Sequence, residues 1–95
     1  MESVSYKVEI YPSYEWQKDA KDAGISHREL EIFSLVIKGY RYKEIANVVD
    51  IQPQSVRNHM QRLLTKLGAK NGSQALVLAI SKKLINVEYG NNLLP

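Results

Sequence analysis

Cysteine is absent from this 95-residue sequence, which excludes a disulfide scaffold, a thiolate metal site and a cysteine nucleophile. Long apolar runs are absent too, since the longest, residues 75–80, is far shorter than a membrane span. The N-terminal residues MESVSYKVEIY contain no apolar stretch of the kind that a signal peptide needs. We therefore expect one small, soluble, cytoplasmic domain that has no membrane partner.

Acidic residues are missing from one long part of the chain. Residues 51–87 contain none, and residues 51–95 carry six Lys/Arg against Glu88 alone, a net charge of +5. Residues 1–50 carry seven Lys/Arg against nine Asp/Glu, a net charge of −2. A basic half of this kind favours a surface that faces a polyanion, although an ordinary solvated cationic face has the same composition.

Groups that could perform catalysis are few. His27 and His59 are the only histidines, and neither has a Ser, Asp or Glu at the spacing of a triad or a metal site. The sequence also has no glycine-rich loop for phosphate. We therefore expect no enzyme activity, no catalytic residue, no bound metal and no cofactor.

From Ile25 onward the pattern is helical. Ser26 and Glu29 have the spacing of a capping box, which predicts a helix over residues 27–38 that Gly39 ends. Further helices are predicted over residues 42–49, 53–67 and 73–83. Short connections between four helices indicate an all-α domain.

The predicted domain covers residues 25–85 and leaves residues 86–95 as a C-terminal tail. Residues 1–24 form an N-terminal extension of unknown role. Its segment SYKVEIYP alternates polar and apolar residues like a short strand, and residues 13–24 predict a short helix. Because one strand alone is unstable, this strand must pack on the domain, pair with another strand or stay loose.

The helix predicted over residues 53–67 has two distinct faces. At 100° per residue, one sector directed toward the core contains Val56, Met60, Leu63, Leu64 and Leu67. The opposite side contains amides and cations but no carboxylate: Gln54, Asn58, Gln61, Arg62 and Thr65. Arg and amide side chains can bind base edges in pairs of hydrogen bonds, so this face suits DNA. A short helix, a tight turn and this longer helix have the layout of a helix-turn-helix DNA reader.

The motifs that follow one another here resemble the LuxR/NarL-type, GerE-like helix-turn-helix domain. They are ISHRELEI at residues 25–32, KEIA at 43–46, IQPQSVRNH at 51–59 and KLGAK at 66–70. The resemblance covers about 60 residues in order and without gaps. Two positions depart from the family pattern. Gln52 replaces the usual Ser or Thr N-cap of the recognition helix, and Gly72 stands where an Arg often precedes the last helix.

The resemblance implies a sequence-specific, double-stranded DNA-binding transcriptional regulator that acts on the bacterial nucleoid. By position it implies base contacts from Arg57, Asn58 and Gln61. The expected phosphate contacts are Lys43, Gln54, Ser55, Arg62 and Lys66. The alternative is a helix-turn-helix module that docks on RNA polymerase or another regulator, because residues 1–16 contain four aromatic residues.

The resemblance also implies a homodimer formed through the last helix. Residues 73–85, SQALVLAISKKLI, are apolar around most of a helix, with Leu76, Ala79 and Ile80 directed toward the core. The predicted dimer interface is therefore Val77, Leu78, Ser81 and Leu84. The alternative is that these side chains pack under the N-terminal extension.

Overall fold

A computed structural model describes residues 6–10 and 24–89. In chain order it contains β1 (Tyr6–Ile10), α2 (His27–Ile37), α3 (Tyr42–Val49), α4 (Pro53–Leu67), α5 (Gly72–Ser81) and β2 (Ile85–Tyr89). The four predicted helices are confirmed; α3 and α4 have the predicted bounds. The helix predicted over residues 13–24 lies outside the described residues except for Gly24. None of the described helices is long and apolar enough to cross a membrane.

Local hydrogen bonds define both ends of α2. The Ser26 hydroxyl accepts from the Glu29 backbone at 3.1 Å, and the Ser26 N–H donates to the Glu29 carboxylate at 2.9 Å, so the capping box is confirmed. At the other end Gly39 has a φ of 96°. The Gly39 N–H donates to Val36 and the Tyr40 N–H donates to Leu35, a pairing that closes a helix when the residue after its cap is left-handed.

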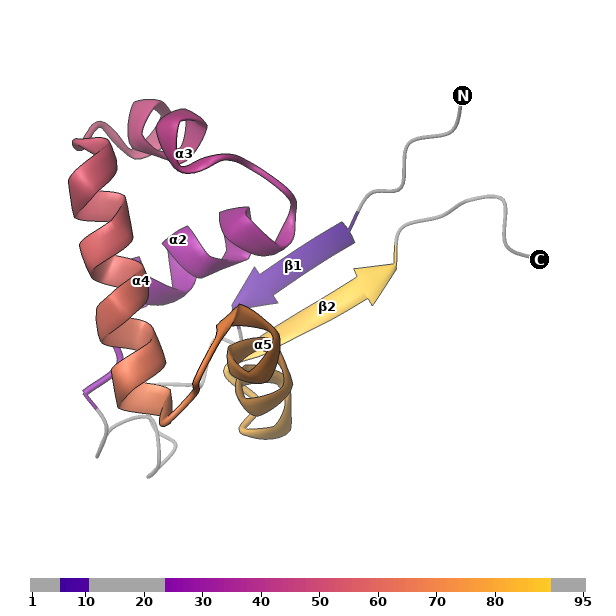
Figure 1. The fold of residues 1–95 in the computed structure, drawn as a ribbon. Helices are drawn as coiled ribbons and strands as arrows, with labels where there is room; N and C mark the ends of the chain where they lie inside the picture. Colours follow the sequence, from indigo (N-terminus) through magenta and orange to yellow (C-terminus); the bar gives the residue numbers. More distant parts are fainter. Residues whose placement is uncertain (1–5, 11–23, 90–95) are drawn as a thin grey trace.

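The core lies where α2, α3 and α4 meet. As predicted, the inner face of α4 buries Val56, Met60, Leu63 and Leu67. These side chains join the buried apolar residues of α2 and α3, which include Leu30, Ile32, Phe33, Ile45 and Ala46. Figure 1 shows α3 near the N-terminal end of α4 and α5 near its C-terminal end. The core therefore fixes α4 by one face and leaves the opposite face outward.

Residues from the two ends of the chain form a small sheet. The strand predicted in the N-terminal extension is confirmed as β1, and it pairs with β2 in antiparallel register, Val8 opposite Val87 and Ile10 opposite Ile85. Val8 and Ile85 are buried against the helices. The second strand was not predicted: β2 covers Ile85, the last residue of the predicted domain, and residues 86–89 of the predicted tail. The fold is thus the predicted four-helix domain with a two-stranded sheet added.

Candidate nucleic-acid interface

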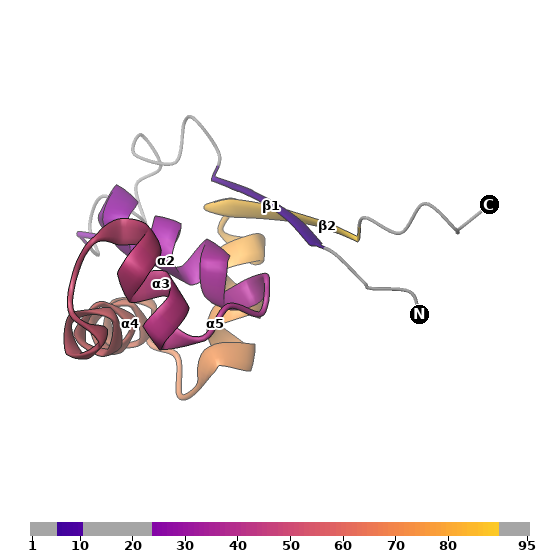
Figure 2. The same ribbon diagram turned by 90° about the horizontal axis from the view of Figure 1, so that it is seen from above.

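Helix α4 lies along one side of the molecule, and the β1–β2 sheet lies on the other side (Figures 1 and 2). The outer face of α4 exposes the side chains predicted from its helical periodicity: Gln54, Asn58, Gln61, Arg62 and Thr65. Arg57 is exposed as well. Since α4 contains no acidic residue, this face presents amide and guanidinium groups to an approaching ligand with no carboxylate among them.

A tight turn sets the direction of α4. Asp50 closes α3 in the left-handed region, with φ 58° and ψ 53°, and the Ile51 N–H donates back to Ala46 at 3.0 Å. Pro53 occupies the first position of α4, where its missing N–H costs no hydrogen bond. Gln52 makes no side-chain capping bond, in agreement with the weak cap inferred from the sequence. In the first turn of α4 the Ser55 N–H donates to the Gln52 carbonyl at 2.9 Å, so the backbone rather than a side-chain cap closes this helix end.

The guanidinium of Arg57 lies 5.5 Å from the centroid of the Tyr42 ring. Tyr42 is the half-buried first residue of α3, so this cation–π contact ties α4 to the start of the preceding helix. Tyr42 was not among the predicted site residues. The available signal was an aromatic residue at the start of α3, but nothing in the spacing showed which side of α4 its ring would face.

Two other outer side chains contact each other. The Gln54 side-chain amide donates to the Asn58 side-chain oxygen at 3.1 Å, four residues apart on α4. This bond holds both amides on one side of the helix. The Asn58 N–H groups are not used in it, so they can still be donated to an acceptor outside the protein.

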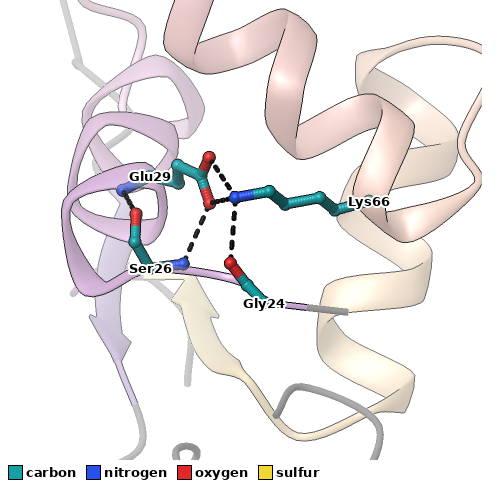
Figure 3. A network of polar contacts seen from close by, with 4 residues as sticks. All are labelled: Gly24, Ser26, Glu29 and Lys66. Atoms are coloured by element: carbon teal, nitrogen blue, oxygen red, sulfur yellow. Dashed lines mark hydrogen bonds and ion pairs between the residues drawn. The ribbon is translucent and has the colours of Figure 1, made fainter. Parts of the chain in front are cut away.

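Lys66 is directed into the molecule rather than toward a phosphate (Figure 3). Its amine contacts both Glu29 carboxylate oxygens, at 2.8 and 3.0 Å, and donates to the Gly24 carbonyl at 2.9 Å. The Glu29 side chain is 3% exposed and the Lys66 side chain 29%. Lys66 was expected to contact phosphate, but in this structure its amine is hydrogen-bonded to the buried Glu29 carboxylate and the Gly24 carbonyl.

This network lowers the pKa of Glu29. Burial, the largest single influence, raises the pKa of the carboxyl group, but the Lys66 hydrogen bond, the Ser26 backbone N–H and the charge of Lys66 together outweigh it. Glu29 therefore stays ionised inside the capping box and pairs α2 with the end of α4. It serves as a structural anchor behind the outer face of α4.

The other expected phosphate contacts remain available. Lys43 is exposed on α3, directly after Tyr42, whose ring contacts Arg57 of α4. Arg62 is exposed on α4, and Ser55 is half-buried in its first turn. Within residues 6–10 and 24–89, no group of three or more His, Cys, Asp or Glu could hold a metal ion.

The surface of α5 differs from the prediction at two positions. Val77 is 62% exposed and Ile80, expected in the core, is 44% exposed. Leu84 was expected in the dimer interface but is fully buried. The reason is the end of α5: Lys83 has a φ of 57° and the Leu84 N–H donates back to Ala79 at 2.9 Å. This turn directs Leu84 inward, whereas Ile80 is exposed because α5 packs on the core through Ala75 and Ala79.

Comparison with known proteins identifies related sequences for the helical part of the chain. A model of the family described as "Bacterial regulatory proteins, luxR family" matches residues 23–79. Over 61 residues the chain is 41% identical to "Oxygen regulatory protein NreC" of Staphylococcus aureus strains JH9, JH1 and USA300. The match spans 64% of this chain and 28% of the length of those proteins. Both strands of the sheet lie outside the residues that the family model matches.

Proposed function

We propose that α4 is the recognition helix of this chain, which belongs to the luxR family of bacterial regulatory proteins. Members of this family are DNA-binding transcriptional regulators rather than enzymes. In this proposal α4 enters the major groove of duplex DNA, and α3 braces it against the backbone. One observation carries the proposal: the exposed face of α4 consists of amide, guanidinium and hydroxyl groups with no carboxylate. Such a regulator acts in the cytoplasm, on the nucleoid.

Base edges are read by Arg57, Asn58 and Gln61. Arg matches the paired acceptors of guanine, and Asn or Gln matches the acceptor and donor of adenine. All three side chains are exposed, and the Tyr42 ring supports the Arg57 guanidinium. The Gln54–Asn58 hydrogen bond supports Asn58 in the same way.

Phosphates are bound by Lys43, Gln54, Ser55 and Arg62. These residues lie on α3 and α4, where positive or donor groups can meet the backbone on either side of the groove. Lys66 no longer belongs to this set, because it is paired with Glu29.

We further propose that two copies associate through α5 in a two-fold dimer. Val77, Ile80 and Ser81 are exposed at a helical spacing of three and four residues, and half-buried Leu78 lies beside them. Exposed apolar side chains on one helix face favour an interface. The two recognition helices would then lie about 34 Å apart, which is one turn of DNA.

Binding to duplex DNA as a function of salt concentration tests the proposal. We expect the logarithm of the association constant to fall steeply and linearly with the logarithm of salt concentration, with a slope of about −0.9 per phosphate contact. Lys43→Ala should weaken binding to all duplexes alike and reduce the slope by about 1. Lys38→Ala removes the same charge from the exposed C-cap of α2, outside α3, α4 and the sheet, and should change neither quantity.

Absence of duplex binding at low salt would overturn the proposal. It would favour the other class of function, a helix-turn-helix module that docks on a protein, whose binding depends far less on salt.

A further inference from the structure

The outer edge of β1 has no partner strand among the described residues. On its other edge, β1 pairs with β2, and these two strands form the whole described sheet. A bare edge presents unpaired backbone N–H and C=O groups, which natural proteins usually cover or pair. A two-stranded sheet is also smaller than the sheets that are stable in isolation. The edge of β1 is therefore a surface on which an added strand would gain backbone hydrogen bonds.

The charges of β1 select the partner strand. Lys7 and Glu9 lie on the solvent side of the sheet, with side chains 64% and 55% exposed, while Val8 between them is buried. In an antiparallel pair of two β1 strands centred on Val8, each Lys7 lies opposite Glu9 of the other copy. Centring the pair on Lys7 or on Glu9 would instead place two like charges opposite each other. Only one of these registers is therefore self-complementary.

The position of the sheet separates this contact from the proposed DNA-binding face. Both views place the sheet on the side of the molecule away from α4 (Figures 1 and 2), so a partner on β1 would leave the proposed DNA-binding face uncovered. Within one chain Lys7 and Glu9 form an exposed ion pair at 3.9 Å, which is weak and can be exchanged for a pair between copies. The strands also lie outside the part of the chain that the family shares.

We propose that β1 pairs with β1 of a second copy of this chain, giving a continuous four-stranded antiparallel sheet in the order β2–β1–β1′–β2′. The Val8 residues of the two copies lie at the two-fold axis. This contact is separate from the α5 face and does not depend on DNA binding. Together the two contacts would join α5 dimers into larger assemblies.

Sedimentation velocity of a Val77→Asp chain tests the contact, because this exposed substitution removes association through α5. We expect the Val77→Asp chain still to form reversible dimers. Adding Lys7→Glu or Glu9→Lys should weaken the dimer by at least about tenfold, because each change places two like-charged pairs in the sheet. The combined reversal Lys7→Glu/Glu9→Lys should restore dimers, and so should mixing the two single variants.

Lys70→Glu, an exposed charge reversal outside the sheet, serves as the control and should leave dimers unchanged. Thermal melts by circular dichroism verify that each variant is folded. Recovery in the mixture would also show that neither single variant had lost its sheet. A monomeric Val77→Asp chain would overturn the proposal, as would dimers that tolerate both single reversals or a mixture that fails to associate.

Discussion

Arg57 is the side chain whose conformation the structure explains most directly. Its guanidinium lies against the Tyr42 ring, and this contact limits the rotamers of a long side chain that would otherwise lose entropy on binding a base. The residues behind the interface act in the same sense. The ion pair between Glu29 and Lys66 holds the C-terminal end of α4 against α2, which fixes the orientation of the outer face of α4.

Substitutions of Tyr42 should distinguish the contribution of its ring to DNA affinity from that of its hydroxyl. Tyr42→Phe keeps the cation–π contact, so affinity for the preferred duplex should stay close to that of the wild type. Tyr42→Ala should lose about 1 kcal/mol, or about fivefold in affinity, on that duplex and less on unrelated DNA. Fluorescence anisotropy with both duplexes measures the difference. Equal losses on the two duplexes, or an equal effect of Phe and Ala, would contradict the positioning role.

Glu29 should make the free energy of unfolding depend on pH in the acidic range. Its pKa is lower in the folded chain than its ordinary value of 4.5, so its stabilising contribution is complete well above pH 4.5 and is lost as the pH falls through the folded pKa. Glu29→Gln should cost about 2 kcal/mol at pH 7 and should flatten the dependence on pH below about pH 5. Urea unfolding at a series of pH values measures both effects.

Glu31→Gln is the matched control for that series. This substitution also removes a carboxylate from α2. The Glu31 carboxylate forms an ion pair with Arg28 at 3.1 Å, and this pair is exposed to solvent. This substitution should change stability by well under about 1 kcal/mol. A Glu29→Gln chain that unfolds like the Glu31→Gln chain would show that the buried network adds nothing.

At the scale of the element, local signals in the sequence account for the helices. Ser26 with Glu29, Pro53, Gly39 and Gly68 mark starts and ends through interactions within a few residues, so they can be read without the fold. The pairing of β1 with β2 could not be predicted in this way. It joins residues from the two ends of the chain, and INVEY alone carries too few residues to distinguish a strand from a tail.

In the candidate site, too, some features follow from local sequence patterns and others depend on tertiary contacts. The outer face of α4 follows from helical periodicity, so the exposure of Asn58 and Gln61 could be predicted, whereas Arg57 was selected only by the family resemblance. The roles of Lys66 and Leu84 could not, because the first depends on a carboxylate from α2 and the second on the left-handed turn at Lys83. Long side chains and residues beyond a helix end are placed by tertiary contacts that no local pattern contains.

The end of α4 offers a test of this local control. Gly68 has a φ of 71° and an added Cβ would meet no atom within 4 Å, so Gly68→Ala should cost about 1 kcal/mol through backbone strain alone. Gly72, the first residue of α5, has equal space without the positive φ, and Gly72→Ala should be neutral or stabilising by up to about 1 kcal/mol. Chemical denaturation compares the two, and equal effects would contradict the assignment of strain to Gly68.

At the scale of the whole molecule, the three proposed contact surfaces lie on different elements. The half of the chain from residue 51 onward carries the excess positive charge and contains α4, while the sheet joins the two ends of the chain on the opposite side. The exposed face of α5 lies on a third element. We therefore expect that the proposed DNA recognition, association through α5 and pairing through β1 can be altered one at a time by substitutions of single exposed residues.

Selection of bound duplexes from a random pool, carried out in parallel with the wild-type and Arg57→Ala chains, tests the central claim that α4 reads base edges. We expect the wild type to enrich two related half-sites whose centres are about one helical turn apart. Arg57→Ala should enrich the same sites with relaxed preference at one position in each half and about 1–3 kcal/mol weaker binding. No enrichment by the wild type, or an identical base preference for both chains, would contradict the assignment of α4 as the reader.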